Sequence, residues 1–326
     1  MNATLDTMPI LILYPHRRCN CRCVMCDIWK DRTASEITPD ELHRHLEDIQ
    51  RLNVQWVVFS GGEPLMHSDL FRLTQLLRCS GIRITLLTTG LLLKLHASRI
   101  VDSVDDVIVS LDGPPAIHDQ VRRIPGAFAR LEAGIAALHE MDPDFHVSAR
   151  STVQRLNYRY VRETAKTAHR ISCRSVSFLA ADMTSQAFNR TPALDVLGQS
   201  KLALDEGQIL ELEGEFAGLL SDWNGTPFLV EDESKLGRIL LHFRAQLGLV
   251  EPVAPRCNAP WVSAVVESDG TVRPCFFQNP IGNLTEGSLL QVINGPEAVR
   301  YRSGLDVSTD PVCKRCVCSL NWKECA

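Results

Sequence analysis

The sequence lacks an excess of positive charge, a long hydrophobic run and a secretion signal. Its formal net charge is −5, which argues against a nucleic-acid partner because such proteins carry a basic face. No polybasic block or cationic amphipathic helix predicts contact with a membrane surface. No apolar run approaches the roughly 20 residues of a transmembrane helix, and the first 14 residues have no basic region of a signal peptide. We therefore expect a cytoplasmic protein that binds neither nucleic acid nor membrane.

Cysteine, in contrast, is abundant and clustered. Of the 12 cysteines, four lie in residues 19–26, six follow residue 256, and Cys79 and Cys173 stand alone. In a chain without a secretion signal, such clusters indicate metal binding or catalysis rather than disulfide bonds. The two isolated cysteines are interpreted as small buried apolar residues.

The first cluster contains three cysteines in a C-x3-C-x2-C spacing, Cys19, Cys23 and Cys26, directly after an apolar run at 10–14. Thiolates so close together either share a metal or remain crowded thiols. A cubane iron–sulfur cluster is usually held by four cysteines. Holding it with three leaves one iron open, much as a catalytic zinc keeps a position for substrate. The alternative is a structural zinc site with Cys21 or His16 as the fourth ligand.

This loop resembles the signature of the radical S-adenosylmethionine (SAM) superfamily. Three further motifs follow in the order of that family, over about the first 180 residues. They are Ser60-Gly61-Gly62-Glu63-Pro64, Leu87-Thr88-Thr89-Gly90 and Val109-Ser110-Leu111-Asp112-Gly113. The resemblance implies that Cys19, Cys23 and Cys26 hold a [4Fe–4S] cluster that binds SAM.

The resemblance also implies which residues contact SAM. Met25 would lie near the adenine, and the Gly-Gly-Glu-Pro segment would bind the ammonium group. Arg122 is the better candidate for the carboxylate, and Arg150 competes with it. Residues at the end of the Val109–Gly113 motif would contact the ribose hydroxyls or lie near the sulfonium. The residues concerned are Met25, Gly61, Gly62, Glu63, Thr89, Ser110, Asp112, Arg122 and Arg150. Simple turns at the glycines and Asp112, and surface ion pairs at the arginines, are the alternatives.

Strand-like and helical patterns alternate along the first half of the chain. Apolar, β-rich runs predict strands at 10–14, 55–60, 82–88, 106–110, 146–153 and 175–179. Helices are predicted from the capping box at Thr38, from Ser68 to Gly81, at 127–141 and at 158–170. This alternation indicates parallel βαβ units. The resemblance implies an α/β fold with a (βα)6 partial TIM barrel.

Two further regions are expected after the barrel at 1–180. Two amphipathic helices, through Ile209 and through Leu236, predict a helical linker or substrate lid at 181–255. At 256–326 we expect a small domain with a β-hairpin formed by 261–266 and 271–276.

The second group of cysteines belongs to this last region. The run Cys257, Gly270-x4-Cys275 and Cys313-x2-Cys316 is similar to the twitch half of a SPASM extension. The resemblance implies one auxiliary [4Fe–4S] cluster held by these four cysteines. Cys318 could replace Cys316, and Cys325 remains as a further thiol. A zinc ribbon is the alternative, since a hairpin cysteine with a C-x2-C pair is also how such sites are built.

The resemblance implies an enzyme that reductively cleaves SAM to a 5′-deoxyadenosyl radical and abstracts hydrogen from a substrate carbon. A flavodoxin- or ferredoxin-type reductant would supply the electron. With an auxiliary cluster, the favoured reaction is a two-electron oxidation of a small natural-product intermediate. Only about nine residues precede the first strand, too few for a peptide-binding domain. The alternatives are a peptide-modifying enzyme that crosslinks or epimerises, and a non-catalytic iron–sulfur or zinc binding protein.

Overall fold

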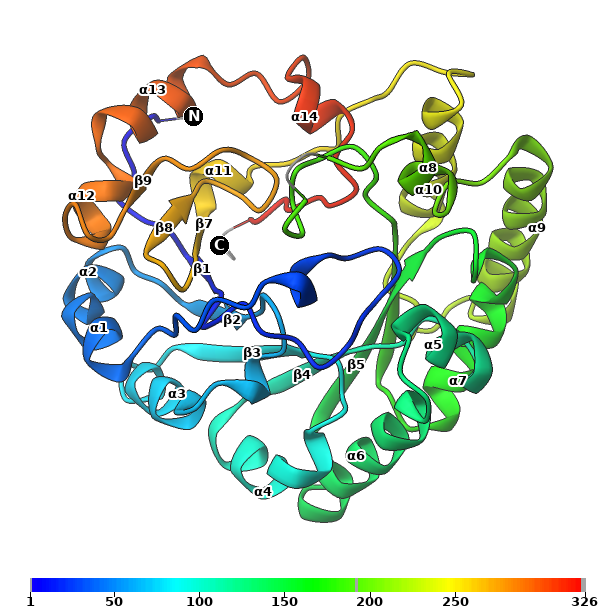
Figure 1. Cartoon of the computed structure of the whole chain (residues 1–326), viewed down its shortest axis with the longest axis horizontal. Coiled ribbons are helices and arrows are strands. Elements are labelled where there is room, and N and C mark those ends of the chain that lie inside the picture. Colours follow the sequence, from blue (N-terminus) through cyan, green and yellow to red (C-terminus); the bar gives the residue numbers. More distant parts are fainter. Residues whose placement is uncertain (1, 191–192, 324–326) are drawn as a thin grey trace.

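The computed structural model describes residues 2–190 and 193–323 (Figure 1). At its centre six parallel strands lie side by side in chain order, β1 to β6. Their bounds are β1 Ile10–Leu13, β2 Trp56–Phe59, β3 Arg83–Thr88, β4 Asp106–Ser110, β5 His146–Val153 and β6 Ser175–Ala180. Strands pair in chain order because each crossover helix returns the chain beside the strand that it left.

α-Helices cover the outer face of this curved sheet, whereas η1 lies in the loop after β1 (Figure 1). The bounds of the helices up to β6 are η1 Ile28–Lys30, α1 Pro39–Arg44, α2 Leu46–Arg51, η2 Pro64–Met66, α3 Leu70–Arg78, α4 Leu93–Ser103, α5 Pro115–Arg122, α6 Ala127–Met141, η3 Tyr158–Tyr160 and α7 Val161–Arg170. The predicted capping box is confirmed, since Thr38 and Glu41 bond each other's backbone N–H groups. The expected (βα)6 partial barrel is therefore confirmed.

The C-terminal hairpin is part of the same sheet. Strand β7, Ser263–Val266, pairs in parallel with β1, and β8, Thr271–Arg273, and β9, Gly282–Asn283, continue antiparallel to give nine strands. The predicted hairpin is confirmed, but its strands are shorter than predicted. Trp261 lies in a short helix, α11 Ala259–Val262, with proline in its first turn. Strand β8 ends where Pro274 has no N–H to donate to the ladder.

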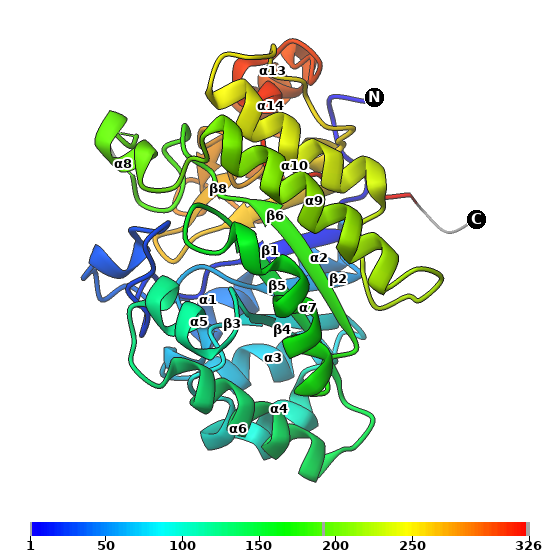
Figure 2. The same ribbon diagram turned by 90° about the vertical axis from the view of Figure 1, so that its right-hand side faces the viewer.

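The helices between barrel and hairpin close the free edge of the barrel. They are α8 Val196–Ser200, α9 Glu206–Asp222 and α10 Glu233–Gln246. Helix α9 packs on α7, and α10 packs on β6 (Figure 2). Beside them, Val176 of β6 exchanges backbone hydrogen bonds with Phe228 and Val230 at 2.8 and 3.0 Å. The two predicted amphipathic helices are confirmed, and α8 was not predicted.

Three short helices, α12 Leu289–Ile293, α13 Pro296–Gly304 and α14 Pro311–Lys314, complete the described chain. Of the isolated cysteines, Cys173 is buried as expected, whereas Cys79 is exposed because it caps the solvent-side end of α3. Within the described residues, no helix is long and apolar enough to cross a membrane.

Candidate functional site

The loop that carries Cys19, Cys23 and Cys26 follows β1 and is fastened to the end of α5. The N–H groups of Arg22 and Val24, on either side of Cys23, donate to the carbonyls of residues 122 and 121, both at 3.1 Å. The guanidinium of Arg122 adds a third contact, because its Nη1 lies 3.5 Å from the Sγ of Cys23. The loop is thus held by bonds that do not depend on its thiols.

The buried Glu63 carboxylate connects the segments after β2 and β3 with the cysteine loop. It is fully buried and accepts hydrogen bonds from Thr88, from Leu65 N–H, and from both the N–H and the hydroxyl of Thr89. Thr89 also contacts Asn20 of the cysteine loop at 2.9 Å. The acceptor positions of this carboxylate thus face donors from the chain. The expected direct contacts of Glu63 and Thr89 with SAM stay predictions.

Two glycines before Glu63 are required by close contacts within the chain. Gly61 has a φ of +101°, and a Cβ there would lie 3.0 Å from the ring of Tyr14. A Cβ on Gly62 would lie 2.0 Å from the carbonyl oxygen of Arg18. Glycine is therefore needed for packing against the segment before Cys19, in addition to any approach of a ligand.

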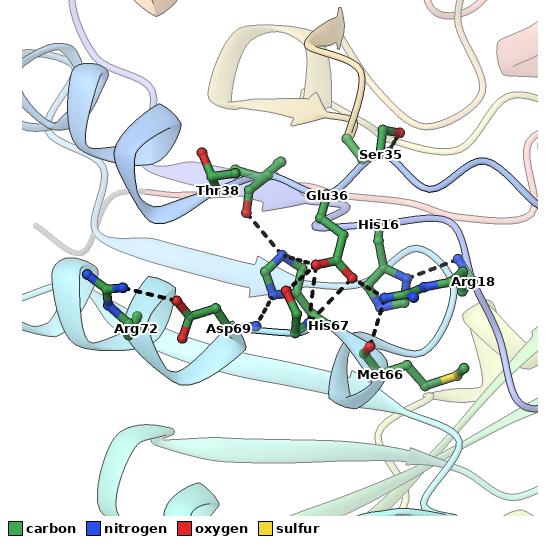
Figure 3. A network of polar contacts seen from close by, with 12 residues as sticks. His16, Arg18, Ser35, Glu36, Thr38, Met66, His67, Asp69 and Arg72 are labelled. Carbon is green, nitrogen blue, oxygen red and sulfur yellow. Dashed lines mark hydrogen bonds and ion pairs between the residues drawn. The ribbon is translucent and has the colours of Figure 1, made fainter.

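A polar network below these glycines fixes the same segment (Figure 3). His16 is buried, accepts a hydrogen bond from Arg18 N–H through Nδ1, and bonds the carbonyl of Glu63 through Nε2 at 2.9 Å. Arg18 pairs with Glu36 and donates to the carbonyl of Met66. Both ring nitrogens of His16 are thus occupied, and burial lowers its pKa to about 4. The suggestion that His16 supplies a zinc ligand is wrong.

The two candidate arginines for the SAM carboxylate occupy different environments. Arg122 is buried, forms an ion pair with the fully buried Asp112, and contacts Cys23. Asp112 also accepts from Thr152 N–H at 2.8 Å. The expected contacts of Asp112 with the ribose and of Arg122 with the SAM carboxylate stay predictions. Arg150 on β5, paired in register with Ser110 of β4, is exposed and donates to Ser177 at 3.2 Å.

A loop after β6 covers the cysteine loop, which sequence reasoning missed. The N–H of Asp27 donates to the carbonyl of Phe188 at 3.1 Å, and Arg190 donates to the carbonyl of Met25. Arg190 is itself held by a buried ion pair with Asp182. Phe188 has a φ of 62°, a left-handed conformation that is strained for a bulky residue. No sequence motif predicts this loop, because its contacts with the cysteine loop involve backbone atoms.

The three thiols are crowded in a way that a bound cation would relieve. Burial raises the pKa of Cys19 and Cys26 to about 12, and neighbouring thiolates add to the rise. The pKa of Cys23 is lowered to about 6, first by a hydrogen bond from Cys21 and then by Arg122, against the effect of burial. Cys21 is therefore a neighbour that hydrogen-bonds a thiolate.

Metal ligation keeps thiolates deprotonated, so this donor set fits an iron–sulfur cluster. In the part of the chain that the structure describes, no three His, Cys, Asp or Glu side chains meet as ligands of one metal ion. The donor set and the anchoring of its loop nevertheless suit a cluster.

The C-terminal cysteines form a second group. Cys257 follows α10, Cys275 follows β8, and Cys313 and Cys316 lie in and after α14. Burial raises the pKa of Cys275 to about 11 and of Cys313 to about 12, and the thiolates of the group raise one another further. Donors to sulfur are Ala259 N–H on Cys257, at 3.4 Å, and the Gln278 amide on Cys313, at 3.6 Å.

Cys318 also belongs to this second group. Burial raises the pKa of its thiol to about 11, with opposing effects of Arg150 and Asp182 and a further rise from Cys257. The Sγ of Cys316 bonds the carbonyl of Cys318 at 3.2 Å. Both candidates for the fourth ligand are therefore present, and Cys325 lies outside the described residues.

A cavity of about 320 Å³ lies between the two halves of the site. Gly61, Gly62 and Tyr14 line one side, and residues 276–280, directly after Cys275, line the other. Phe188 of the covering loop lies 4.7 Å from Phe276 between ring centroids. Glu267, at the tip of the β7–β8 hairpin, forms ion pairs with Arg17 and Arg273. The cavity thus has an aromatic wall and a charged wall, and part of its lining directly follows Cys275 in the chain.

Comparison with known proteins agrees with this site. Residues 13–168 match the family model of the radical SAM superfamily, and residues 257–317 match that of the SPASM iron–sulfur cluster-binding domain. The AdoMet-dependent heme synthase of Methanosarcina barkeri is 33% identical over 159 residues, 46% of this chain and 44% of that protein. The pre-heme d1 synthase of Dinoroseobacter shibae is 34% identical over 131 residues, 39% of this chain and 32% of that protein. The chain thus spans less than half the length of these curated relatives.

Among solved structures, SuiB of Streptococcus suis bound to its precursor peptide SuiA superposes with a TM-score of 0.70. The match covers 97% of this chain and 72% of that chain at 15% identity, so the likeness concerns the fold. The expected cofactors follow from the two domains: SAM with one [4Fe–4S] cluster in the barrel, and iron–sulfur binding in the C-terminal part.

Proposed function

We propose, from the premise that the chain belongs to the radical SAM superfamily and carries a SPASM cluster-binding domain, that it oxidises a small natural-product intermediate by two electrons. In this proposal the auxiliary [4Fe–4S] cluster at the C-terminal cysteines is the electron acceptor. The working units would be the barrel at 1–180, the helical segment at 181–255 and the cluster domain at 256–326.

The observation that carries the proposal is the position of the cavity. Its walls are the glycines of the Gly-Gly-Glu-Pro segment and the residues that follow Cys275. A substrate held there would face both cysteine groups. A volume of about 320 Å³ is at the lower end of the range for small-molecule sites. The names of the two curated relatives, a heme and a pre-heme d1 synthase, also favour a small molecule.

Cys19, Cys23 and Cys26 would hold the cluster that, when bound and reduced, supplies the electron for cleaving SAM to methionine and a 5′-deoxyadenosyl radical that abstracts hydrogen. The remaining work belongs to the chain. Glu63 and Thr89 hold the cysteine loop against the strand ends through Asn20. Phe188 and Phe276 pack at 4.7 Å on one wall of the cavity and would exclude water from a reactive intermediate.

We assign the SAM carboxylate to Arg150, an exposed residue within β5. A fork-shaped donor suits a carboxylate. Ser110 lies beside it in register at the end of β4 and is assigned to the ribose. Met25, which packs against the core of the barrel and whose carbonyl is held by Arg190, is assigned to the adenine. The reductant would be a flavodoxin or ferredoxin.

The test is anaerobic turnover of the reconstituted enzyme with SAM and a panel of aminocyclitols, sugars and short peptides. The balanced reaction converts SAM and a substrate SubH2 to methionine, 5′-deoxyadenosine, Sub and a proton, with the priming electron returned. We expect equal amounts of oxidised product and 5′-deoxyadenosine without steady consumption of reductant. The variant Cys257→Ala/Cys275→Ala should keep SAM cleavage and lose oxidation.

A modified peptide in the panel would instead establish the peptide-modifying alternative, which the fold shared with peptide-bound SuiB favours. Products formed with unchanged yield by Cys257→Ala/Cys275→Ala would exclude the auxiliary cluster as acceptor. If the loaded protein formed no 5′-deoxyadenosine from SAM under reduction, the non-catalytic iron–sulfur or zinc alternative would replace the proposal.

A further inference from the structure

The buried guanidinium of Arg122 contacts a cysteine of the cluster loop. We propose that Arg122, held by Asp112, is a positioning residue that donates a hydrogen bond to the Sγ of Cys23 and raises the reduction potential of the three-cysteine cluster. The inference rests on that cluster but not on the proposed two-electron oxidation.

The geometry places Cys23 and Arg122 in a fixed relation. Nη1 of Arg122 lies 3.5 Å from the Sγ of Cys23, within the range of an N–H···S contact. The carbonyls of residues 121 and 122 accept from the N–H groups of Val24 and Arg22, at 3.1 Å each. These two backbone bonds flank Cys23, so its sulfur is held beside the end of α5 where the guanidinium emerges.

The guanidinium is fixed from its other side by Asp112. The carboxylate of Asp112 has no exposure and forms an ion pair with Arg122, whose side chain is 8% exposed. Its second oxygen accepts from Thr152 N–H at 2.8 Å, and the N–H of Asp112 donates to Nδ1 of His118 at 3.2 Å. Asp112 is therefore anchored to β5 and α5, and the chain Asp112–Arg122–Cys23 links the barrel to one cluster ligand.

The direction of the effect follows from charge. One electron from an external reductant such as dithionite converts [4Fe–4S]²⁺ to [4Fe–4S]⁺, so reduction makes the cluster more negative. A buried cation next to a ligating sulfur stabilises the more negative state, and a hydrogen bond to that sulfur acts in the same direction. Both effects are strong in a site from which water is excluded. Removing Arg122 should therefore make the cluster harder to reduce.

Arg190 supplies a matched control. It is also buried, also paired with an aspartate, and also bonded to the cysteine loop. Its guanidinium donates to the carbonyl of Met25, however, and not to a sulfur. Comparing Arg122→Met with Arg190→Met separates a hydrogen bond to a cluster ligand from the presence of a buried charge nearby.

The experiment is a redox titration of the reconstituted enzyme without substrate, followed by electron paramagnetic resonance. The signal of the three-cysteine cluster is identified as the one that changes when SAM is added, because only that cluster has an open iron. We expect Arg122→Met to lower the ratio of reduced to oxidised cluster about tenfold at a fixed potential, which is 59 mV for one electron. Arg190→Met should shift this ratio clearly less.

Two outcomes would overturn the inference: an unchanged ratio in Arg122→Met, or an equal shift in Arg190→Met. If Arg122→Met does not fold, Asp112→Asn/Arg122→Met replaces it, since this pair leaves no unpaired buried carboxylate. In the wild type, arginine labelled with ¹⁵N in its guanidinium should show hyperfine coupling to the reduced cluster, and absence of that coupling would also overturn it. Because no substrate is present, these results are independent of the proposed oxidation.

Discussion

The two cysteine groups of this chain are supported in different ways. The barrel group lies in a loop tied by backbone bonds to α5, by Thr89 and Asn20 to the strand ends, and by Arg190 to the covering loop. These bonds exist without any contribution from the thiols. The loop that carries the barrel group is therefore anchored by the protein itself, as sites for demanding chemistry need to be.

The C-terminal group has fewer such supports. Its five described cysteines, from Cys257 to Cys318, lie in three separate stretches of the chain, and its contacts to sulfur come from neutral amides. The strand β7 ties its start to β1, and Asn258 N–H donates to the carbonyl of Leu320 at 2.7 Å. Long connections join these points, so a bound cluster would itself bring the group together. The barrel cluster would thus bind to a loop that is already anchored, whereas the C-terminal cluster would itself help to hold its segments together.

Removing the barrel thiols should produce the largest effect. The variant Cys19→Ala/Cys23→Ala/Cys26→Ala should lose all 5′-deoxyadenosine formation and keep about four irons against about eight in the wild type. Its melting temperature should stay near that of the wild type, because the loop is anchored without its thiols. Iron and sulfide analysis, product chromatography and anaerobic thermal unfolding measure these three quantities.

The control for this variant is Cys79→Ala, which removes an exposed thiol outside both groups and should behave as the wild type. A triple variant without any iron would show that the C-terminal group binds zinc or nothing. A large loss of thermal stability in the triple variant would contradict the idea that the barrel loop is anchored without its thiols.

Removing both clusters by chelation should have a smaller and local effect. We expect hydrogen exchange to rise mainly in residues 274–320, because few hydrogen bonds, such as those of the Gln278 amide to Asp310 and Cys313, join the thiol positions there. Strands β1 to β6 and the loop at 19–26 should keep most of their protection. Mass spectrometry of peptides from loaded and metal-free protein measures this difference. Equal loss of protection in both loops would remove the contrast between the two groups.

The sequence predicted the barrel well because its strands and helices have clear periods and its motifs lie at strand ends. Strands β4 and β5 and helix α6 fall on the predicted residues. The ends of the hairpin were predicted wrongly because Pro260 and Pro274 shorten the strands, although the apolar sequence pattern continues. Roles within the site were harder to predict, since a carboxylate in a motif can face a ligand or the chain itself.

Glu63, Asp112 and Arg122 illustrate this limit. All three lie in segments that resemble SAM-binding motifs, yet each is buried among partners from other strands. Those partners, Thr89, Thr152 and Cys23, are distant in sequence, so no spacing rule reveals the pairs. The covering loop at 182–190 was missed for the same reason.

The smallest predicted effect concerns Glu231, where the segment before α10 contacts β6. This carboxylate accepts from Phe178 N–H on β6 at 2.9 Å, and burial raises its pKa to about 7 despite the nearby Arg150. The folded state therefore holds its proton more tightly than the unfolded chain. The stabilising contribution is present below pH 4.5, the ordinary value, and is lost as the pH rises toward 7 and above.

Glu231→Gln keeps an acceptor for Phe178 N–H but cannot ionise, so its stability should not fall across this range. We expect the variant to equal the wild type near pH 5 and to melt a few degrees higher at pH 8, since about 1 kcal/mol shifts a melting temperature by a few degrees in a chain of this size. Glu140→Gln, at an exposed site on α6, is the control and should follow the wild type at both values. If Glu231→Gln lost stability with pH as the wild type does, Glu231 would not be the titrating group at this contact. The pH dependence would then come from other titratable groups of the chain.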